Sequence, residues 1–516
     1  MNAQLDAAWK LLPNYLGQHL LVSLAALLLG LAVSLPLTLA AHRSPAVRWP
    51  VLTLASLIQT IPGLALLALF YPLLLALSAL SVKALGAGFS ALGFLPSLLS
   101  LALYAMLPIL RNGVTGLAGV DPAVVEAARG MGMTDGQRLW RVELPLAAPV
   151  IMAGVRTATV WTIGAATLAT SVGQTSLGNY IFSGLQTENW VFVLFGCAAS
   201  AVLALAADQL LGLVEKALRA RQPRRIWAGG LGLLIGAGLI LAPLAAPKPD
   251  VTYVIGAKNF SEQYILAELI ASRLEASGAH VTRKEDLGSA IAYRAVAAGE
   301  IDAYVDYSGT LWANVINRTD NPGREAVLAG LTTELRQRDG VLVLGSLGFE
   351  NAYALAMKRA RAEALGIRTL DDLARHAGEL TMGGDLEFFS RPEWAKVRDA
   401  YGLHFRAQKQ FQPTFMYNAL ASGEADVISA FSSDGRIAAD DLVVLEDPRR
   451  ALPPYDAVIL VSPQRAGDEA FLRLLRPLIG KILVAPMREA NYSVDRDRDK
   501  RTPAQAAAEL KQKLGL

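Results

Sequence analysis

Long apolar runs in the first half of the chain constrain its fold more than any other feature. A helix needs about 20 predominantly apolar residues to cross a bilayer. Six stretches reach that length, at 16–41, 51–80, 84–110, 146–173, 189–207 and 226–246. We therefore expect an all-α membrane region of about six spans, followed after residue 248 by a region of ordinary soluble composition.

Two of these stretches contain features that leave their form open. Pro62, Gly63 and Pro72 interrupt 51–80, which predicts either a kinked helix or a span plus a re-entrant piece. Arg156 is the only formal charge in 146–173, and it would either reach a membrane interface or face the protein interior. We expect it to reach the interface.

Lys and Arg predict which side of the membrane each loop faces, because cytoplasmic loops collect these residues. If the first span runs from outside to inside, the outer segments that flank the spans carry only Lys10, Lys83 and Lys248. The inner segments then carry Arg43, Arg48, Arg111, Arg129, Arg138, Arg141, Lys216, Arg219, Arg221, Arg224 and Arg225. This bias places the amino terminus and everything after residue 246 outside, and the segment 126–145 inside.

The polar segment 126–145 separates two apolar runs and carries small residues at fixed spacing. Ala127 and Ala128 allow close contact with a partner helix, Gly132 would end a first short helix, and Pro145 would end a second one. An ordinary amphipathic helix at the membrane surface is the plain alternative. The spacing resembles the coupling loop of ABC-importer permeases. That resemblance implies an ATPase contact made by Glu126, Ala127, Ala128, Gly132, Leu144 and Pro145.

The resemblance extends over most of residues 16–215. The stretches "IQTIPGLALLAL" (58–69), "YAMLPILRNGVTGL" (104–117), "VELPLAAPVIMAGVRTATV" (142–160) and "LGNYIFSGL" (177–185) are similar to the permease of the osmoprotectant family, which imports glycine betaine, carnitine and choline. The chain has no phosphate-binding Gly-x4-Gly-Lys-Ser/Thr loop. The resemblance therefore implies two copies of this chain with two separate ATPase chains, which bind the ATP and Mg²⁺, and no cofactor in this chain.

From residue 251 the pattern changes to short β runs that alternate with amphipathic helices, as in an α/β protein. The stretch 259–278 predicts a helix with a buried apolar stripe. Asn259 would cap this helix, and Glu262 three residues later would complete a capping box.

An internal repeat relates two parts of this region at a constant offset of 124 residues. "YRAVAAGEIDAYVDYS" (293–308) matches "YNALASGEADVISAFS" (417–432), so that Tyr307 and Ser308 correspond to Phe431 and Ser432. Open α/β sheets bind ligands beyond the carboxyl ends of their strands. We therefore expect two similar lobes that close on one ligand, with hinges near 351–355 and 452–457.

The same residues resemble the substrate-binding protein of the osmoprotectant importers. "IGAKNFSEQYILAELI", "GEIDAYVDYSGT", "GFENAYAL", "AFSSDGRI" and "PPYDAV" stand in that family's order across nearly all of 251–465. The resemblance implies a permease fused to its receptor, an α/β bilobed periplasmic-binding-protein-like (type II) domain. We expect a permease at 1–225, a last span and tether at 226–248, and a receptor at 249–516 with lobes at 249–352 plus 456–516 and at 353–455.

The resemblance also assigns a pocket with two chemically different ends. The aromatic end falls on Tyr307, Tyr353, Phe431 and Tyr455, with Phe388 nearby. The carboxylate-binding end falls on Lys258, Thr310 and Arg391. A trimethylammonium group has no N–H to donate, so aromatic faces recognise it through cation–π contacts, while Arg and Lys suit a carboxylate. A zwitterionic quaternary amine is the expected ligand.

Plainer interpretations of these residues stand beside the pocket. Aromatic residues at strand ends are often core residues, Arg391 beside Pro392 could be a solvated loop charge, and Lys258 could be a surface lysine. Phe431 departs from the family, where a tyrosine is common. Choline lacks the carboxylate that the basic pair would bind, whereas ergothioneine, a betaine, carries one and is the nearest rival ligand.

Other functional classes receive little support from the sequence. The net charge of +3 is nearly neutral for 516 residues and gives no indication of nucleic-acid binding. Gly-x-Ser-x-Gly and His-Glu-x-x-His motifs are missing, so neither a catalytic site nor a metal site is expected. A ligand-gated channel fused to a bilobed receptor is the remaining alternative. We expect a multi-pass importer subunit in the bacterial cytoplasmic (inner) membrane, with its receptor on the outer side.

Overall fold

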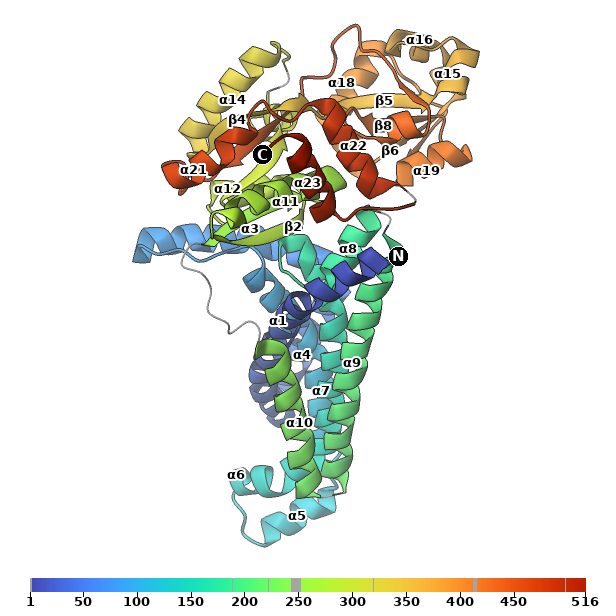
Figure 1. Ribbon diagram of the computed structural model, residues 1–516. Helices are drawn as coiled ribbons and strands as arrows, with labels where there is room; N and C mark the ends of the chain where they lie inside the picture. The colour runs from blue at the N-terminus through green and yellow to red at the C-terminus, as the bar shows by residue number, and fades with distance from the viewer. Residues whose placement is uncertain are drawn as a thin grey trace. The chain divides into compact units, whose positions relative to one another are not determined.

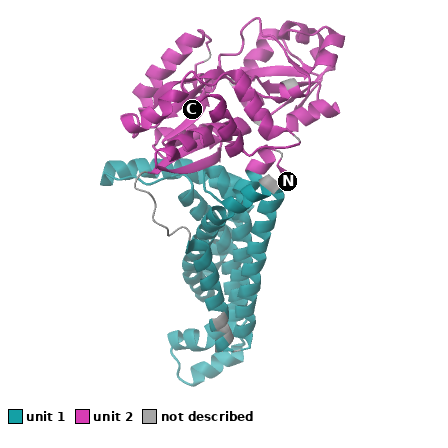
Figure 2. Cartoon of the chain, viewed as in Figure 1, with its two compact units in different colours: residues 1–182, 191–247 teal, residues 183–190, 248–516 magenta. Residues whose placement is uncertain are grey.

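The structure is a computed structural model that describes residues 2–187, 189–220, 222–242, 252–318, 320–411, 415–496 and 498–516. The chain divides into unit 1, Met1–Phe182 with Val191–Pro247, and unit 2, Ser183–Trp190 with Lys248–Leu516 (Figure 2). Unit 1 is helical, and unit 2 contains two mixed β-sheets. The expected fold class is confirmed, while the expected domain limits at 225 and 248 stay a prediction.

Long apolar helices joined by short turns build unit 1 (Figure 1). Among the described residues, five segments are long and apolar enough to cross a membrane: Gln4–Arg43, Gly63–Leu85, Phe94–Ala118, Asp135–Val172 and Trp190–Arg219. The helices are α1 (Asn2–Arg43), α2 (Pro45–Thr60), α3 (Gly63–Leu85), α4 (Phe94–Ala118), α5 (Pro122–Gly130), α6 (Asp135–Arg138), α7 (Leu144–Ala165), α8 (Gly178–Gln186), α9 (Trp190–Arg219) and α10 (Pro223–Leu241).

The second and third expected spans have different limits in the structure. The stretch 51–80 is two helices, because α2 ends at Thr60 and α3 begins only after the extended Ile61 and Pro62. The third span begins at Phe94 instead of residue 84. Gly86 ends α3 with a φ of 72°, and Gly93 precedes α4 with a φ of 76°, which are left-handed conformations that glycine adopts without strain.

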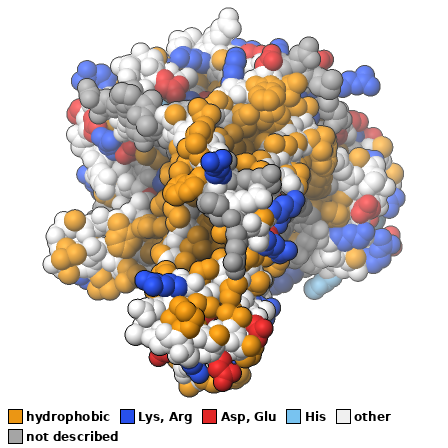
Figure 3. All heavy atoms as spheres, turned by 90° about the horizontal axis from the view of Figure 1, so that it is seen from below, with side chains coloured by type: hydrophobic (Ala, Val, Ile, Leu, Met, Phe, Trp, Pro, Cys, Tyr) orange, Lys and Arg blue, Asp and Glu red, His pale blue; other side chains and the backbone are white. Residues whose placement is uncertain are grey.

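The last expected span, 226–246, is only partly described. The apolar part of α10, Gly229–Leu241, is shorter than the five candidate spans, and residues 243–246 lie outside the described residues. Large apolar side chains are exposed on α3, α9 and α10, and Figure 3 shows apolar side chains over a broad area of the face seen from below. Such exposure suits helices whose solvent is lipid.

Unit 2 has two five-stranded sheets with the same internal plan. The first runs β2-β1-β3-β10-β4 and the second β7-β6-β8-β5-β9. In each sheet the first three strands pair in parallel and the last two pair antiparallel. The strands are β1 (Thr252–Lys258), β2 (His280–Leu287), β3 (Ala303–Tyr307), β4 (Leu342–Glu350), β5 (Tyr353–Lys358), β6 (Thr381–Gly384), β7 (Ala407–Gln410), β8 (Val427–Phe431), β9 (Leu442–Val444) and β10 (Asp456–Val461).

Helices cover both sheets and close the cores of the two lobes. Two C-terminal helices, α22 and α23, pack with α11 beside the first sheet. The longer helices are α11 (Ser261–Ala276), α12 (Ser289–Ala297), α14 (Arg324–Asp339), α15 (Arg359–Leu365), α16 (Leu370–His376), α18 (Pro392–Tyr401), α19 (Phe415–Ser422), α21 (Glu469–Leu475), α22 (Val484–Asp495) and α23 (Pro503–Lys513). The short ones are α13 (Ser308–Thr310), α17 (Leu386–Ser390) and α20 (Arg436–Ala439).

The sequence repeat corresponds to this repeated plan. Its two copies place β3 and β8 third in their respective sheets. Asp302 accepts from the backbone N–H of Val254 on the neighbouring strand at 2.7 Å, and Asp426 accepts from that of Thr381 at 2.9 Å. The same aspartate thus ties the same two strands together in each lobe.

The chain passes between the sheets at two points. It leaves the first sheet after Glu350 and enters the second at Tyr353, and it returns between Val444 and Asp456. These crossovers coincide with the segments where the sequence placed the hinges. The backbone N–H of Asn351 donates to the carbonyl of Tyr455 at 2.9 Å, so the two crossovers run next to each other.

Candidate functional site

A cavity of about 430 Å³ between the two lobes of unit 2 contains most of the expected pocket. We call it the central cavity. Seven expected residues line it: Lys258, Tyr307, Thr310, Tyr353, Arg391, Phe431 and Tyr455. The ring of Phe388 packs behind Tyr353 instead, with centroids 5.0 Å apart. Phe388 is therefore separated from the central cavity by Tyr353 and does not line it.

The repeat delivers one aromatic residue from each lobe to this cavity. Tyr307 ends β3 and Phe431 ends β8. Phe260 lies between them, stacked with Phe431 at 6.3 Å and with Tyr307 at 6.1 Å between ring centroids. Sequence reasoning missed Phe260, although its place between Lys258 and the start of α11 was a usable signal.

The crossovers supply the other two rings. Tyr353 begins β5, and Tyr455 directly precedes β10. Their rings meet edge to face at 5.6 Å, and Tyr353 also lies 5.0 Å from Phe431. Burial and the neighbouring Glu393 raise the pKa of Tyr455 well above its ordinary value, so its hydroxyl stays protonated and donates to Glu393 at 2.7 Å.

Lys258 is buried at the end of β1 and is not a surface lysine. Its ammonium lies 2.6 Å from a carboxylate oxygen of Asp306 and 4.9 Å from the centroid of the Tyr307 ring. A buried charge requires such a partner. Lys258 therefore lines the cavity as part of a buried ion pair with Asp306.

Arg391 is also buried, with 7% of its surface exposed, and is therefore not a solvated loop charge. It lies in the second lobe and donates to the hydroxyl of Thr310 in the first lobe at 3.3 Å. Its guanidinium is 3.5 Å from Glu393 and 5.3 Å from the ring centroid of Tyr353. The expected cationic and aromatic ends thus meet in one cavity, while their roles in binding stay a prediction.

The serine that follows each repeated aromatic residue bonds to a crossover. Ser308 donates to the carbonyl of Pro454 and accepts from the N–H of Asp456, both at 2.9 Å. Ser432 accepts from the N–H of Ala352 at 2.9 Å and donates to the carbonyl of Glu350 at 3.3 Å. Each lobe therefore holds the segment that enters it from the other lobe through an equivalent hydroxyl.

The segment 126–145 of unit 1 has the expected first helix and turn. α5 ends at Gly130, and Gly132 follows with a φ of 78°. Glu126 and Ala127 are exposed, while Ala128 is buried. Met131 and Trp140 expose 78% and 70% of their surfaces, although neither was among the residues expected at the ATPase contact.

Pro145 does not end a helix, contrary to expectation. The helical path continues from α6 through a π-helical turn, Leu139–Glu143, into α7, whose first turn contains Pro145. Proline lacks a backbone N–H and is tolerated in a first turn, where that N–H would have no intrahelical acceptor. Leu144 is half-buried, and the exposed Pro145 lies beside it.

Arg156 pairs with two carboxylates of a neighbouring helix, while its expected reach to a membrane interface stays a prediction. Its guanidinium lies 2.8 Å from Asp208 and 2.7 Å from Glu215, both on α9. Glu215 also pairs with Arg219 at 2.7 Å. The charge therefore joins α7 to α9 inside unit 1.

Two family models cover most of the chain. Residues 27–220 match the binding-protein-dependent transport system inner membrane component. Residues 251–512 match the substrate binding domain of the ABC-type glycine betaine transport system.

Individual relatives agree with these matches. The ergothioneine transport permease/ergothioneine binding protein EgtU of Helicobacter pylori is 31% identical over 484 residues, which is 90% of this chain and 83% of that protein. The glycine betaine/carnitine/choline transport system permease protein OpuCB of Bacillus subtilis is 38% identical over 200 residues, 39% of this chain and 85% of its own. A crystal structure of a glycine betaine/carnitine/choline ABC transporter shares 27% identity at a TM-score of 0.45, covering 51% of this chain and 98% of that one.

Proposed function

The chain belongs to the binding-protein-dependent ABC transporters, as an inner-membrane component fused to a glycine-betaine-type substrate-binding domain, and on that premise we propose which ligand it takes and how. The ligand is a zwitterion that carries a quaternary ammonium group at one end and a carboxylate at the other. Glycine betaine, carnitine and related osmoprotectants have this form.

The observation that carries this proposal is that the buried Arg391, bonded to Thr310, lines the same cavity as aromatic rings from both lobes. A carboxylate accepts two parallel N–H bonds from a guanidinium. A quaternary ammonium is attracted to aromatic faces by about 0.5–2 kcal/mol for each contact. A ligand with only one of these groups would complement only the cationic or only the aromatic residues of the cavity.

Ergothioneine is the second candidate, supported by a specific comparison. The Helicobacter pylori protein with that name matches 90% of this chain. The central cavity of about 430 Å³ lies within the range of about 300–1,000 Å³ typical of small-molecule sites. Glycine betaine would fill only a small part of it, whereas carnitine or ergothioneine would fill more. Choline, which lacks a carboxylate, offers Arg391 no anion beyond its partner Glu393.

The assembly we propose contains two copies of this chain and two ATPase chains, which bind ATP and Mg²⁺. The exposed Glu126, Ala127, Met131 and Trp140 give the segment 126–145 a docking surface of small, acidic and apolar side chains. Closure of the ATPase dimer would pull on this segment and open the path through the helices to the other side. The same segment favours an importer over a ligand-gated channel.

The orientation we propose follows the charge distribution. Lys and Arg gather on the segment 126–145 and at the carboxyl end of α9, which supports a cytoplasmic location for both. The receptor then lies outside the bacterial cytoplasmic membrane, tethered through α10.

Calorimetry on the full-length chain in lipid nanodiscs tests the proposed ligand class. Glycine betaine, carnitine, ergothioneine, choline and a neutral amino acid would be titrated in turn. We expect tight binding of a quaternary-ammonium carboxylate and at least tenfold weaker binding of choline. Binding of only the neutral amino acid would disprove the aromatic pocket and leave the family assignment in place.

A further inference from the structure

Glu262 is a buried carboxylate behind the wall of the central cavity. Only 3% of its surface is exposed. The sequence suggested that Glu262 would complete a capping box with Asn259, but α11 begins at Ser261 after Phe260 and has no side-chain cap. The carboxylate is therefore released from the helix end and faces the interior of unit 2.

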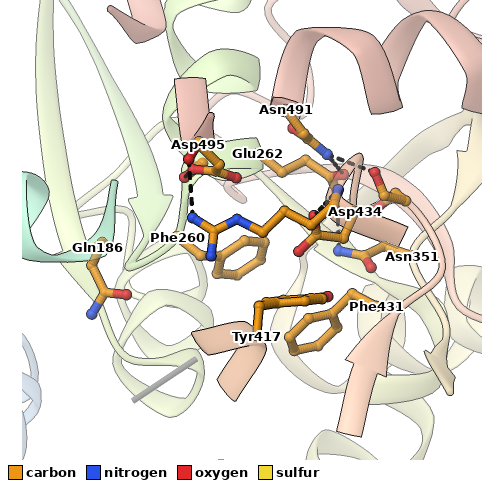
Figure 4. A pocket seen from close by; sticks show the side chains of 12 residues that line it. Gln186, Phe260, Glu262, Asn351, Tyr417, Phe431, Asp434, Asn491 and Asp495 are labelled. Carbon is orange, nitrogen blue, oxygen red and sulfur yellow. Dashed lines mark hydrogen bonds between the residues drawn. The ribbon is translucent and has the colours of Figure 1, made fainter. Parts of the chain in front are cut away.

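Three donors from different parts of unit 2 converge on this carboxylate. The hydroxyl of Tyr307 donates at 2.6 Å, the amide of Asn491 at 2.8 Å, and the amide of Asn351 at 3.1 Å. Figure 4 shows Glu262, Asn351 and Asn491 around a small cavity of about 60 Å³ beside Phe431. Neither oxygen of the carboxylate is left without a donor.

The three donors lie in parts of the domain that surround or connect the central cavity. Tyr307 is a wall residue of the central cavity, and Asn351 lies on the first crossover, where its backbone also bonds to Tyr455 of the second crossover. The Asn491 amide donates at the same time to the carbonyl of Ser433, just beyond β8 in the second lobe. One carboxylate thus links the pocket wall, both crossovers and the opposite lobe.

The hydroxyl of Tyr307 is fully used by this network and does not depend on a ligand. It donates to Glu262 and accepts from the side-chain amide of Gln263 at 3.0 Å. A hydrogen bond donated to a carboxylate is charge-assisted and pushes electron density into the phenol ring. A ring richer in electrons attracts a cation more strongly, because the attraction is electrostatic.

We propose that Glu262 is a positioning residue for ligand binding, which fixes and polarises the Tyr307 ring and holds the crossover at Asn351 beside the central cavity. It acts through Tyr307, Asn351 and Asn491 and does not touch the ligand. The inference rests on the proposed function only in assuming a cationic ligand in the central cavity.

A double-mutant cycle on the full-length chain in nanodiscs tests this role. Glu262→Gln keeps the volume and removes the charge, Tyr307→Phe keeps the ring and removes the hydroxyl, and both are titrated with glycine betaine and with ergothioneine. We expect each single change to weaken binding, Glu262→Gln by about tenfold or more. The double variant should bind no more weakly than Glu262→Gln, because the hydroxyl acts through the carboxylate.

Glu275→Gln is the matched control, on the same helix but paired with Arg283 at 2.9 Å. It should bind like the unmodified chain. Affinity unchanged in Glu262→Gln, or losses that multiply in the double variant, would overturn the proposal. If Glu262→Gln does not fold, Tyr307→Phe decides alone, since unchanged affinity there would also overturn it. Failure of the unmodified chain to bind either probe would instead count against the proposed function.

Discussion

The two lobes of the receptor share a scaffold but differ at the residues that face the central cavity. Asp302 and Asp426 tie equivalent strands, and Ser308 and Ser432 hold equivalent crossovers. The repeat therefore keeps the contacts that build each lobe and hold its crossover.

The aromatic residues at the tips of the repeat show the difference. Tyr307 is buried, and its hydroxyl has two partners within the first lobe. Phe431 has no hydroxyl and is only half-buried. The first lobe thus presents a preorganised wall, and the second contributes Arg391, which reaches across to Thr310. The predicted carboxylate end of the site thus draws its residues from both lobes.

Removing Arg391 should have the largest effect on ligand affinity of the changes considered for the two lobes. Arg391→Ala leaves Glu393 buried without its cation and removes the contact to Thr310. We expect a loss of about 30-fold or more in affinity for a zwitterionic ligand, since truncating one partner of a buried charge pair costs about 2–5 kcal/mol. Calorimetry measures it, and Arg391→Lys should recover only part of the loss. Equal affinities of Arg391→Ala and the unmodified chain would show that Arg391 does not bind the ligand.

The repeated aspartates should differ in their importance for stability. Asp302 is buried and also pairs with Arg465 at 2.9 Å, whereas Asp426 keeps 24% of its side chain exposed and lies 3.9 Å from Arg361. We expect Asp302→Ala to cost about 2–3 kcal/mol and Asp426→Ala about 1–2 kcal/mol. The melting temperatures of the two variants show which substitution destabilises the receptor more. A larger drop for Asp426→Ala would contradict the comparison.

A buried acid in the first lobe should make the stability of the receptor depend on pH. Burial raises the pKa of Asp286, at the end of β2, to about 7, while its ordinary value is about 4. The folded state then binds the proton more tightly, so stability falls as pH rises from about 4 to 7 and stays lower above that range. The melting temperature at pH 5 should exceed that at pH 8, and Asp286→Asn should shrink the difference. Asn also tolerates the φ of 63° found there. An unchanged difference would place the pH dependence elsewhere.

Replacing the two serines that hold the crossovers should have a smaller effect on stability and ligand affinity, which differs between the two. Ser308 is fully buried and Ser432 is half-buried, so Ser308→Ala leaves the backbone groups of Pro454 and Asp456 with less access to water. Each loss should cost about 1 kcal/mol and weaken binding by less than about tenfold, more for Ser308→Ala. Calorimetry on each variant tests the order, and Ser→Thr changes serve as controls that keep the hydroxyl.

Restoring a hydroxyl in the second lobe should have the smallest effect. Phe431→Tyr keeps the ring and adds a group at a half-buried position. We expect affinity to change by about threefold or less, because surface-accessible changes usually cost within about 0.5 kcal/mol. A tenfold gain in calorimetry would mean that the missing hydroxyl is a determinant of specificity and that the lobes are less different than the structure indicates.

The sequence allowed the two-lobed plan to be predicted because the repeat records it directly. The aromatic-serine step at 307–308 and 431–432 marked both strand ends, and the residues around the crossovers followed the order of the family. These signals are local, since a strand, its end and the next turn lie within a few residues.

Features that depend on distant partners could not be predicted in this way. Glu262 had the spacing of a capping residue, but Tyr307, Asn351 and Asn491 compete for its carboxylate in the folded domain. Arg156 pairs with Asp208 and Glu215, which lie more than 50 residues further along the chain and give no local signal in the sequence. Tertiary contacts decided both cases.

The ion cluster between α7 and α9 has a consequence for how the protein enters the membrane. A lone arginine near the centre of a spanning helix costs about 2.5–3.5 kcal/mol to insert, and Arg156 meets its two carboxylates only after α9 has been synthesised. α7 therefore gains its partner late, and the two helices are expected to settle in the bilayer as a pair. A truncated chain that stops before Asp208 would leave α7 with an unpaired charge and make it a target for membrane quality control.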